Sequence, residues 1–169
     1  LLASSADRNG EHGALAAGGA VVRIEGAGMS KNKKTGLIAR EQARIKGGEV
    51  VVSENGAVGL AADGGSTVEL NSLRAVANYE GGVFVDDQSS CLLERAKIEN
   101  NRLVCAQAIN GSRLEIKGGE ISGCASYAAV ADKGALLKLS GMSILRAEGY
   151  GVTVGLGSTL VMANAWISG

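Results

Sequence analysis

Acidic side chains recur at a fixed spacing in the first half of the chain. Asp63 and Asp86 are 23 residues apart, and Asp87 directly follows Asp86. If residues at this spacing are neighbours in space, the carboxylates repel one another, and a divalent cation would relieve that repulsion. The pattern therefore predicts a calcium site at Asp63, Asp86 and Asp87. The alternative is a solvated corner, in which Arg40 partly neutralises Asp63.

The remaining reactive side chains are isolated. His12 is the single histidine, and no Ser, Cys or Asp is arranged beside it as a nucleophile and base, so no catalytic residue is predicted. Cys91, Cys105 and Cys124 are an odd number without the spacing of metal ligands. We expect Cys91 to be a buried thiol and expect no disulfide for the other two. Unpaired thiols favour an intracellular location, although the sequence leaves the compartment open.

Composition limits the partners. The 17 basic and 17 acidic residues give no net charge, so the excess of Lys and Arg that drives phosphate binding is missing and nucleic acid is not an expected partner. The sequence contains no run of about 18 apolar residues, the length that a membrane-spanning helix needs. With 26 glycines, no proline and 3% aromatic residues, the core must consist of small and aliphatic side chains.

An internal repeat of 23 residues organises the whole chain. The residue at position 1 of each repeat is small, and position 17 is mostly aliphatic. Position 1 comprises Gly13, Gly36, Gly59, Gly82, Cys105, Ala128 and Gly151, and position 17 comprises Met29, Val52, Ala75, Ile98, Ile121, Ile144 and Ile167. Apolar residues alternate with polar ones inside each repeat, which is typical of strands.

This pattern predicts an all-β, single-stranded parallel β-helix, a solenoid of about seven 23-residue coils with three short strands each. Residues 1–12 form an N-terminal lead-in. The β-helix occupies residues 13–169, with coils starting at residues 13, 36, 59, 82, 105, 128 and 151.

Position 20 of the repeat carries amides. We expect a structural ladder in which stacked asparagines hydrogen-bond from coil to coil, although asparagine is also simply a good turn residue. The ladder comprises Asn32, Asn55, Asn78 and Asn101, and Cys124 and Ala147 follow at the same spacing. Opposite charges also recur 23 residues apart, at Arg40/Asp63, Lys46/Glu69, Glu94/Lys117, Lys97/Glu120 and Glu115/Lys138.

The succession of Asn, a short turn, Gly and alternating apolar residues resembles the right-handed parallel β-helix repeats of the pectate-lyase and polygalacturonase superfamily. The catalytic motifs of polygalacturonases are not matched. Of those that end just before the glycine column, only His12-Gly13 agrees in position, whereas Asp86-Asp87 and Arg44-Ile45-Lys46 lie elsewhere in the repeat. The resemblance therefore implies a fold more firmly than an activity.

Apolar residues at outward positions predict an interaction surface. It comprises Ile38, Phe84, Val130, Leu136, Leu145 and Trp166. The few aromatic residues are not expected to line one face, as polysaccharide binding would favour. The leading hypothesis is a non-enzymatic scaffold that binds proteins or the flanking coils of a larger chain or assembly. The alternative is a polysaccharide-binding or polysaccharide-cleaving module of the pectate-lyase type.

Overall fold

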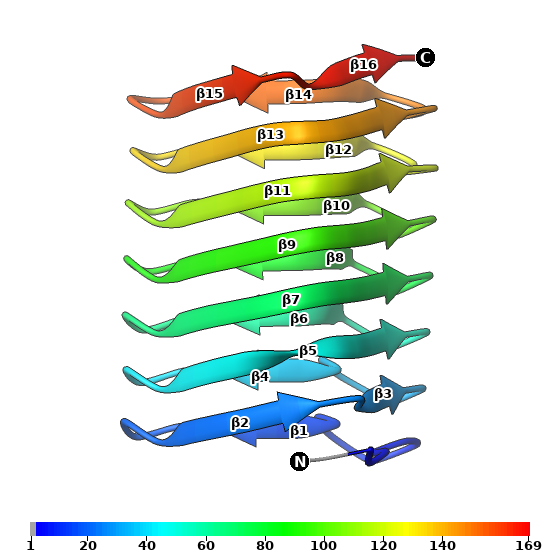
Figure 1. Ribbon diagram of the computed structural model, residues 1–169, viewed down its shortest axis with the longest axis vertical. Helices are drawn as coiled ribbons and strands as arrows, with labels where there is room; N and C mark the ends of the chain where they lie inside the picture. The colour runs from blue at the N-terminus through cyan, green and yellow to red at the C-terminus, as the bar shows by residue number, and fades with distance from the viewer. Residues whose placement is uncertain (1–2) are drawn as a thin grey trace.

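The computed structural model describes residues 3–169, which form a column of stacked coils (Figure 1). One side of the column is a seven-stranded parallel sheet in the order β1-β4-β6-β8-β10-β12-β14. Its strands are β1 (Ala14–Ala16), β4 (Leu37–Ala39), β6 (Val58–Ala62), β8 (Gly81–Val85), β10 (Val104–Ala108), β12 (Tyr127–Ala131) and β14 (Tyr150–Val154).

The other side is a nine-stranded parallel sheet whose main path is β15-β13-β11-β9-β7-β5-β2, with β3 paired to β5 and β16 paired to β13. Its strands are β2 (Val21–Glu25), β3 (Gly28–Ser30), β5 (Arg44–Ser53), β7 (Thr67–Val76), β9 (Ser90–Glu99), β11 (Arg113–Ser122), β13 (Leu136–Leu145), β15 (Thr159–Ala163) and β16 (Trp166–Ser168). No helix in the described part of the chain is long and apolar enough to cross a membrane.

The predicted register is confirmed. Ile98 pairs with Ile121, and Ile121 pairs with Ile144, so that like residues lie above one another at the 23-residue spacing. All three are buried between the two sheets. The residues before the first coil keep the same register, because Ser5 forms a bridge with Gly28.

The strand count per coil differs from the prediction in one respect. The second and third predicted strands are separate in the first and last coils, as β2/β3 and β15/β16, but in the five coils between them they join into one ten-residue strand. Each long strand bends at a left-handed residue at position 14 of the repeat. That column has positive φ in every coil: Gly26, Glu49, Ser72, Arg95, Gly118, Gly141 and Asn164.

The asparagine ladder is confirmed and begins one step earlier than predicted, at Asn9. The Asn78 side chain, for example, donates to Asn101 Oδ1 at 3.0 Å and to the carbonyl of Val52 at 3.1 Å. Asn9 makes the equivalent bond to Asn32 Oδ1 at 2.8 Å. The buried amides of Asn55, Asn78 and Asn101 thus each pair with a neighbouring asparagine and with a carbonyl near the end of a strand, which burial requires.

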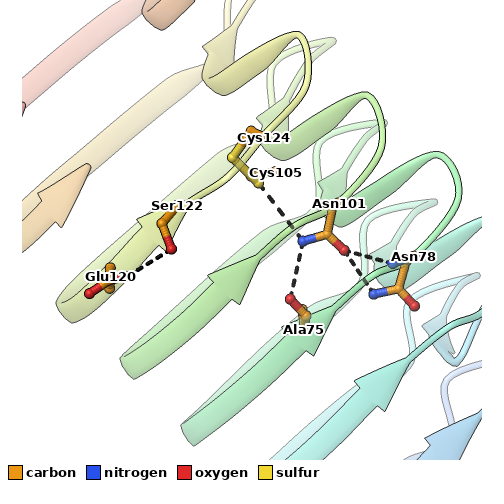
Figure 2. The surroundings of a disulfide bond; sticks show 7 residues. All are labelled: Ala75, Asn78, Asn101, Cys105, Glu120, Ser122 and Cys124. Carbon is orange, nitrogen blue, oxygen red and sulfur yellow. Dashed lines mark hydrogen bonds between the residues drawn. A yellow bond between two sulfur atoms is a disulfide. The ribbon is translucent and has the colours of Figure 1, made fainter. Parts of the chain in front are cut away.

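The expectation that Cys105 and Cys124 lack a partner is wrong. They form a buried disulfide within one coil, directly above the last asparagine of the ladder (Figure 2). Asn101 Nδ2 lies 3.8 Å from Cys105 Sγ. The disulfide removes the ground for inferring an intracellular location from unpaired thiols. Cys91 is the buried free thiol that was predicted, and burial raises its pKa.

Candidate functional site

A shallow groove lies on the outer face of the seven-stranded sheet. It consists of two adjoining pockets of about 260 and 280 Å³ that share Val104 and Gln107. The groove crosses the strands, so it runs along the axis of the column from one coil to the next. Its lining residues are Val58, Glu80, Gly81, Val83, Phe84, Leu103, Val104, Gln107, Tyr127, Val130, Ala131, Asp132, Thr153 and Gly155.

Two columns of the repeat form most of the groove. One is position 3, in which Phe84, Gln107, Val130 and Thr153 are consecutive register partners on β8, β10, β12 and β14. The other is the residue before each coil, where Gly81, Val104 and Tyr127 are register partners. On β10 and β12 the two columns flank a pair of buried residues, and the 23-residue register places like columns above one another. The side chains in these two columns differ in size from coil to coil, and the pockets lie where a side chain is small.

Aromatic rings gather on this face, contrary to the expectation from the sequence. Phe84 lines one pocket and Tyr127 lines the other. The Tyr127 and Tyr150 rings are stacked, with centroids 5.3 Å apart and an interplanar angle of 13°. Only Trp166, on β16, belongs to the other sheet. The sequence did not reveal this grouping because Phe84 and the tyrosines occupy different columns of the repeat.

One further aromatic ring flanks the groove. Tyr79 and Arg102 precede the lining residues Glu80 and Leu103, and the Arg102 guanidinium lies 4.3 Å from the centre of the Tyr79 ring. This cation–π contact holds the arginine on the tyrosine.

The predicted calcium residues lie at the corner that follows the seven-stranded sheet. Asp63 accepts a hydrogen bond from its neighbour Gly64 N at 2.7 Å. Asp86 accepts from Asp87 N at 2.6 Å and from Asn110 Nδ2 at 2.7 Å. Within residues 3–169, no group of three or more His, Cys, Asp or Glu side chains is close enough to hold a metal ion. Turn formation thus accounts for the contacts of Asp63 and Asp86.

The other sequence candidates are spread over the molecule. His12 Nδ1 accepts a hydrogen bond from the Thr35 backbone at 3.3 Å. Ile38, Phe84 and Val130 of the predicted interaction surface share the outward column of the seven-stranded sheet. Leu136, Leu145 and Trp166 lie on the nine-stranded sheet instead. The six residues therefore belong to two different faces.

The comparisons with known proteins agree with the solenoid. The family model of the right-handed β-helix region matches residues 3–109 and 74–169. The chain belongs to the right-handed β-helix family. No match was found among curated protein sequences.

A solved structure shows how this right-handed β-helix relates to a known enzyme. It is a double mutant of the periplasmic alginate epimerase AlgG, and it superposes with a TM-score of 0.79 at 13% sequence identity. The match covers 98% of the β-helix described here and 44% of the epimerase chain. The chain thus spans less than half the length of that enzyme, and at this identity the likeness concerns the fold.

Proposed function

We propose that this chain is a carbohydrate-binding β-helix module that holds a polysaccharide in the groove of the seven-stranded sheet. The observation that carries the proposal is the combination, in one groove, of aromatic rings at Phe84 and Tyr127 with hydrogen-bonding side chains at Gln107 and Thr153. Sugar rings offer C–H faces that pack on aromatic rings and hydroxyls that pair with amides, and both kinds of group are present.

The direction of the groove favours a linear polymer. Because the groove follows the column axis, it presents related side chains at each coil, about 4.8 Å apart. The groove strands β6 to β12 are paired on both sides, and only β14, which carries Thr153, is an edge strand. Over β6 to β12 a ligand therefore meets side chains and not free backbone groups, which disfavours a protein strand that binds there by extending the sheet. The polysaccharide-modifying activity named for the structural match agrees with such a ligand.

Binding is proposed in preference to hydrolysis. Hydrolysis of a glycosidic bond commonly needs two carboxyl groups about 5–9.5 Å apart. The groove carboxylates are Glu80, just before β8, and Asp132, just after β12. Two coil steps alone separate them by about 9.6 Å, and they lie at opposite ends of their strands. This spacing is too wide for a concerted acid and base.

The test is glycan binding by isothermal titration calorimetry, with the Tyr127→Ala variant as the probe. Removing the ring should weaken binding about tenfold, which is ~1.4 kcal/mol. Trp166→Ala, on the other sheet, is the matched control and should bind as the unchanged chain does. If no glycan in a broad panel binds, or if Tyr127→Ala binds normally, the proposal is wrong. A parallel screen for lyase and hydrolase activity on acidic polysaccharides, with and without calcium, would expose an unrecognised active site.

A protein-interaction module is the second candidate. Trp166 is 69% exposed, and Val161 on the same coil is 44% exposed. Exposed apolar groups of this kind mark surfaces that a partner covers. In this case Trp166→Asp should abolish capture of a partner in a pull-down and leave the melting temperature unchanged, while glycan binding would be absent.

A further inference from the structure

We infer that the groove selects uncharged polysaccharides and rejects polyuronates. This inference rests on the proposed function and adds to it the chemical class of the ligand. The observation is the charge of the lining. Among the fourteen residues that form the groove, the ionisable side chains that carry charge at neutral pH are Glu80 and Asp132, and both are acidic.

A polyuronate brings one carboxylate with every sugar. Proteins bind such groups through Arg or Lys side chains, or through calcium shared between ligand and protein. None of the groove residues is Lys, Arg or His. No side-chain cluster within residues 3–169 could hold a bridging metal ion either. The carboxylates of a polyuronate would therefore lose water in the groove without gaining a positive partner.

Two cationic residues are adjacent in sequence to the lining but are not part of it. Arg102 is adjacent to the lining residue Leu103, but its guanidinium lies over the Tyr79 ring. Lys133 follows Asp132, but it is exposed and occupies a left-handed corner with φ of 53°. Both cationic groups lie outside the lining, so the charged side chains that line the groove itself are Glu80 and Asp132.

The lining suits an uncharged sugar polymer. Phe84, Leu103, Val130 and Tyr127 provide an apolar floor for the C–H faces of sugar rings. The carboxylates Glu80 and Asp132 can accept hydrogen bonds from hydroxyl groups at the ends of the groove. A neutral ligand gains both contacts without electrostatic repulsion.

The experiment compares hexasaccharides that differ in charge: neutral gluco- and manno-oligosaccharides, oligogalacturonate and oligomannuronate. Binding is measured by calorimetry, with and without a calcium chelator and at low and high salt. A neutral hexasaccharide should bind at least tenfold more tightly than either uronate, and its affinity should not depend on salt or calcium. Tightest binding of a uronate would overturn the inference.

A charge reversal provides the second arm. The variant Glu80→Lys with Asp132→Lys should raise uronate affinity at least tenfold, and Glu49→Lys, on the exposed face of β5, should leave it unchanged. Melting curves verify that the variants fold. If uronates bind best to the unchanged chain, the carbohydrate-binding proposal stands, but the inference that the groove selects uncharged polysaccharides is wrong. If no oligosaccharide binds at all, the proposed function itself fails and this inference fails with it.

Discussion

At the scale of single residues, positions 1 and 20 of the repeat share one volume. A Cβ atom added to Gly82 would lie 2.8 Å from Asn101 Nδ2 and 2.4 Å from Ile98 Cγ2. The asparagine side chain thus fills the space that glycine leaves. In the fifth coil both residues change together, and Cys105 and Cys124 fill the same volume with a disulfide. The paired departure from the Gly and Asn columns is the sequence signal that could have revealed the bond.

This shared volume predicts that the Gly–Asn pair of one coil and the disulfide of another are interchangeable. Cys105→Gly alone removes the disulfide and should lower the free energy of unfolding by about 3 kcal/mol. Adding Cys124→Asn should recover part of this loss, because the new amide can accept from Asn101 and extend the ladder by one coil. Chemical denaturation of both variants checks the prediction. A double variant no more stable than the single one would contradict the exchange.

At the scale of elements, charged side chains on the long strands pair both with the next coil and with residues of their own strand. Of the five opposite-charge pairs predicted between coils, Lys46 and Glu69 form an ion pair at 2.8 Å. Glu115 was expected to pair with Lys138, but on β11 it pairs with Arg113 and Lys117. Residues two apart on a strand share a face and lie about 6.7 Å apart, against about 4.8 Å between coils. The long side chains of Arg113 and Lys117 span that distance to Glu115.

These contacts predict a pH dependence for β11. The hydrogen bond from Arg113 is the main cause that holds the pKa of Glu115 below its usual value, and Lys117 lowers it further. The stabilisation is present above the unfolded pKa of about 4.3 and is lost as pH falls through the lower folded pKa. Glu115→Gln should therefore cost under ~1 kcal/mol at pH 7, and the difference should vanish in acid.

Arg113→Gln is the diagnostic partner of this variant. It removes the main cause of the lowered pKa, so Glu115→Gln introduced on top of it should have a much smaller effect at pH 7. Denaturation curves recorded between pH 7 and pH 2 measure both differences. A Glu115→Gln effect that persists unchanged at the acid end would refute the assignment.

At the scale of the whole molecule, the core is a set of vertical columns that contact mainly their neighbours above and below. Leu137 and Leu160 are register partners in one column. Leu137 is fully buried, whereas Leu160, in the last coil of this chain, is only partly buried. When these 169 residues are prepared alone, no further coil covers Leu160, so local stability should decrease toward the last coil of that sample.

The column offers a matched pair of truncations. Leu137→Ala should cost about 2–5 kcal/mol, because it opens a cavity between covered coils. Leu160→Ala should cost less than half as much, since its side chain is already partly in contact with water. Thermal unfolding of this chain measures both, and hydrogen exchange should be faster in β14–β16 than in β7–β11. Equal costs would contradict the decrease.

The 23-residue period by itself determined the solenoid, its register and the asparagine ladder, because equal spacing along the chain decides which residues stack. Ile98, Ile121 and Ile144 could be placed above one another from the spacing alone. Only the tertiary structure shows which residues of different repeat positions lie close together. The pairing of Cys105 with Cys124 depends on the shape of one coil's cross-section, which the left-handed corners set. The groove depends on how Phe84 and Tyr127, from different columns, project from the same sheet, and a repeat specifies only vertical neighbours.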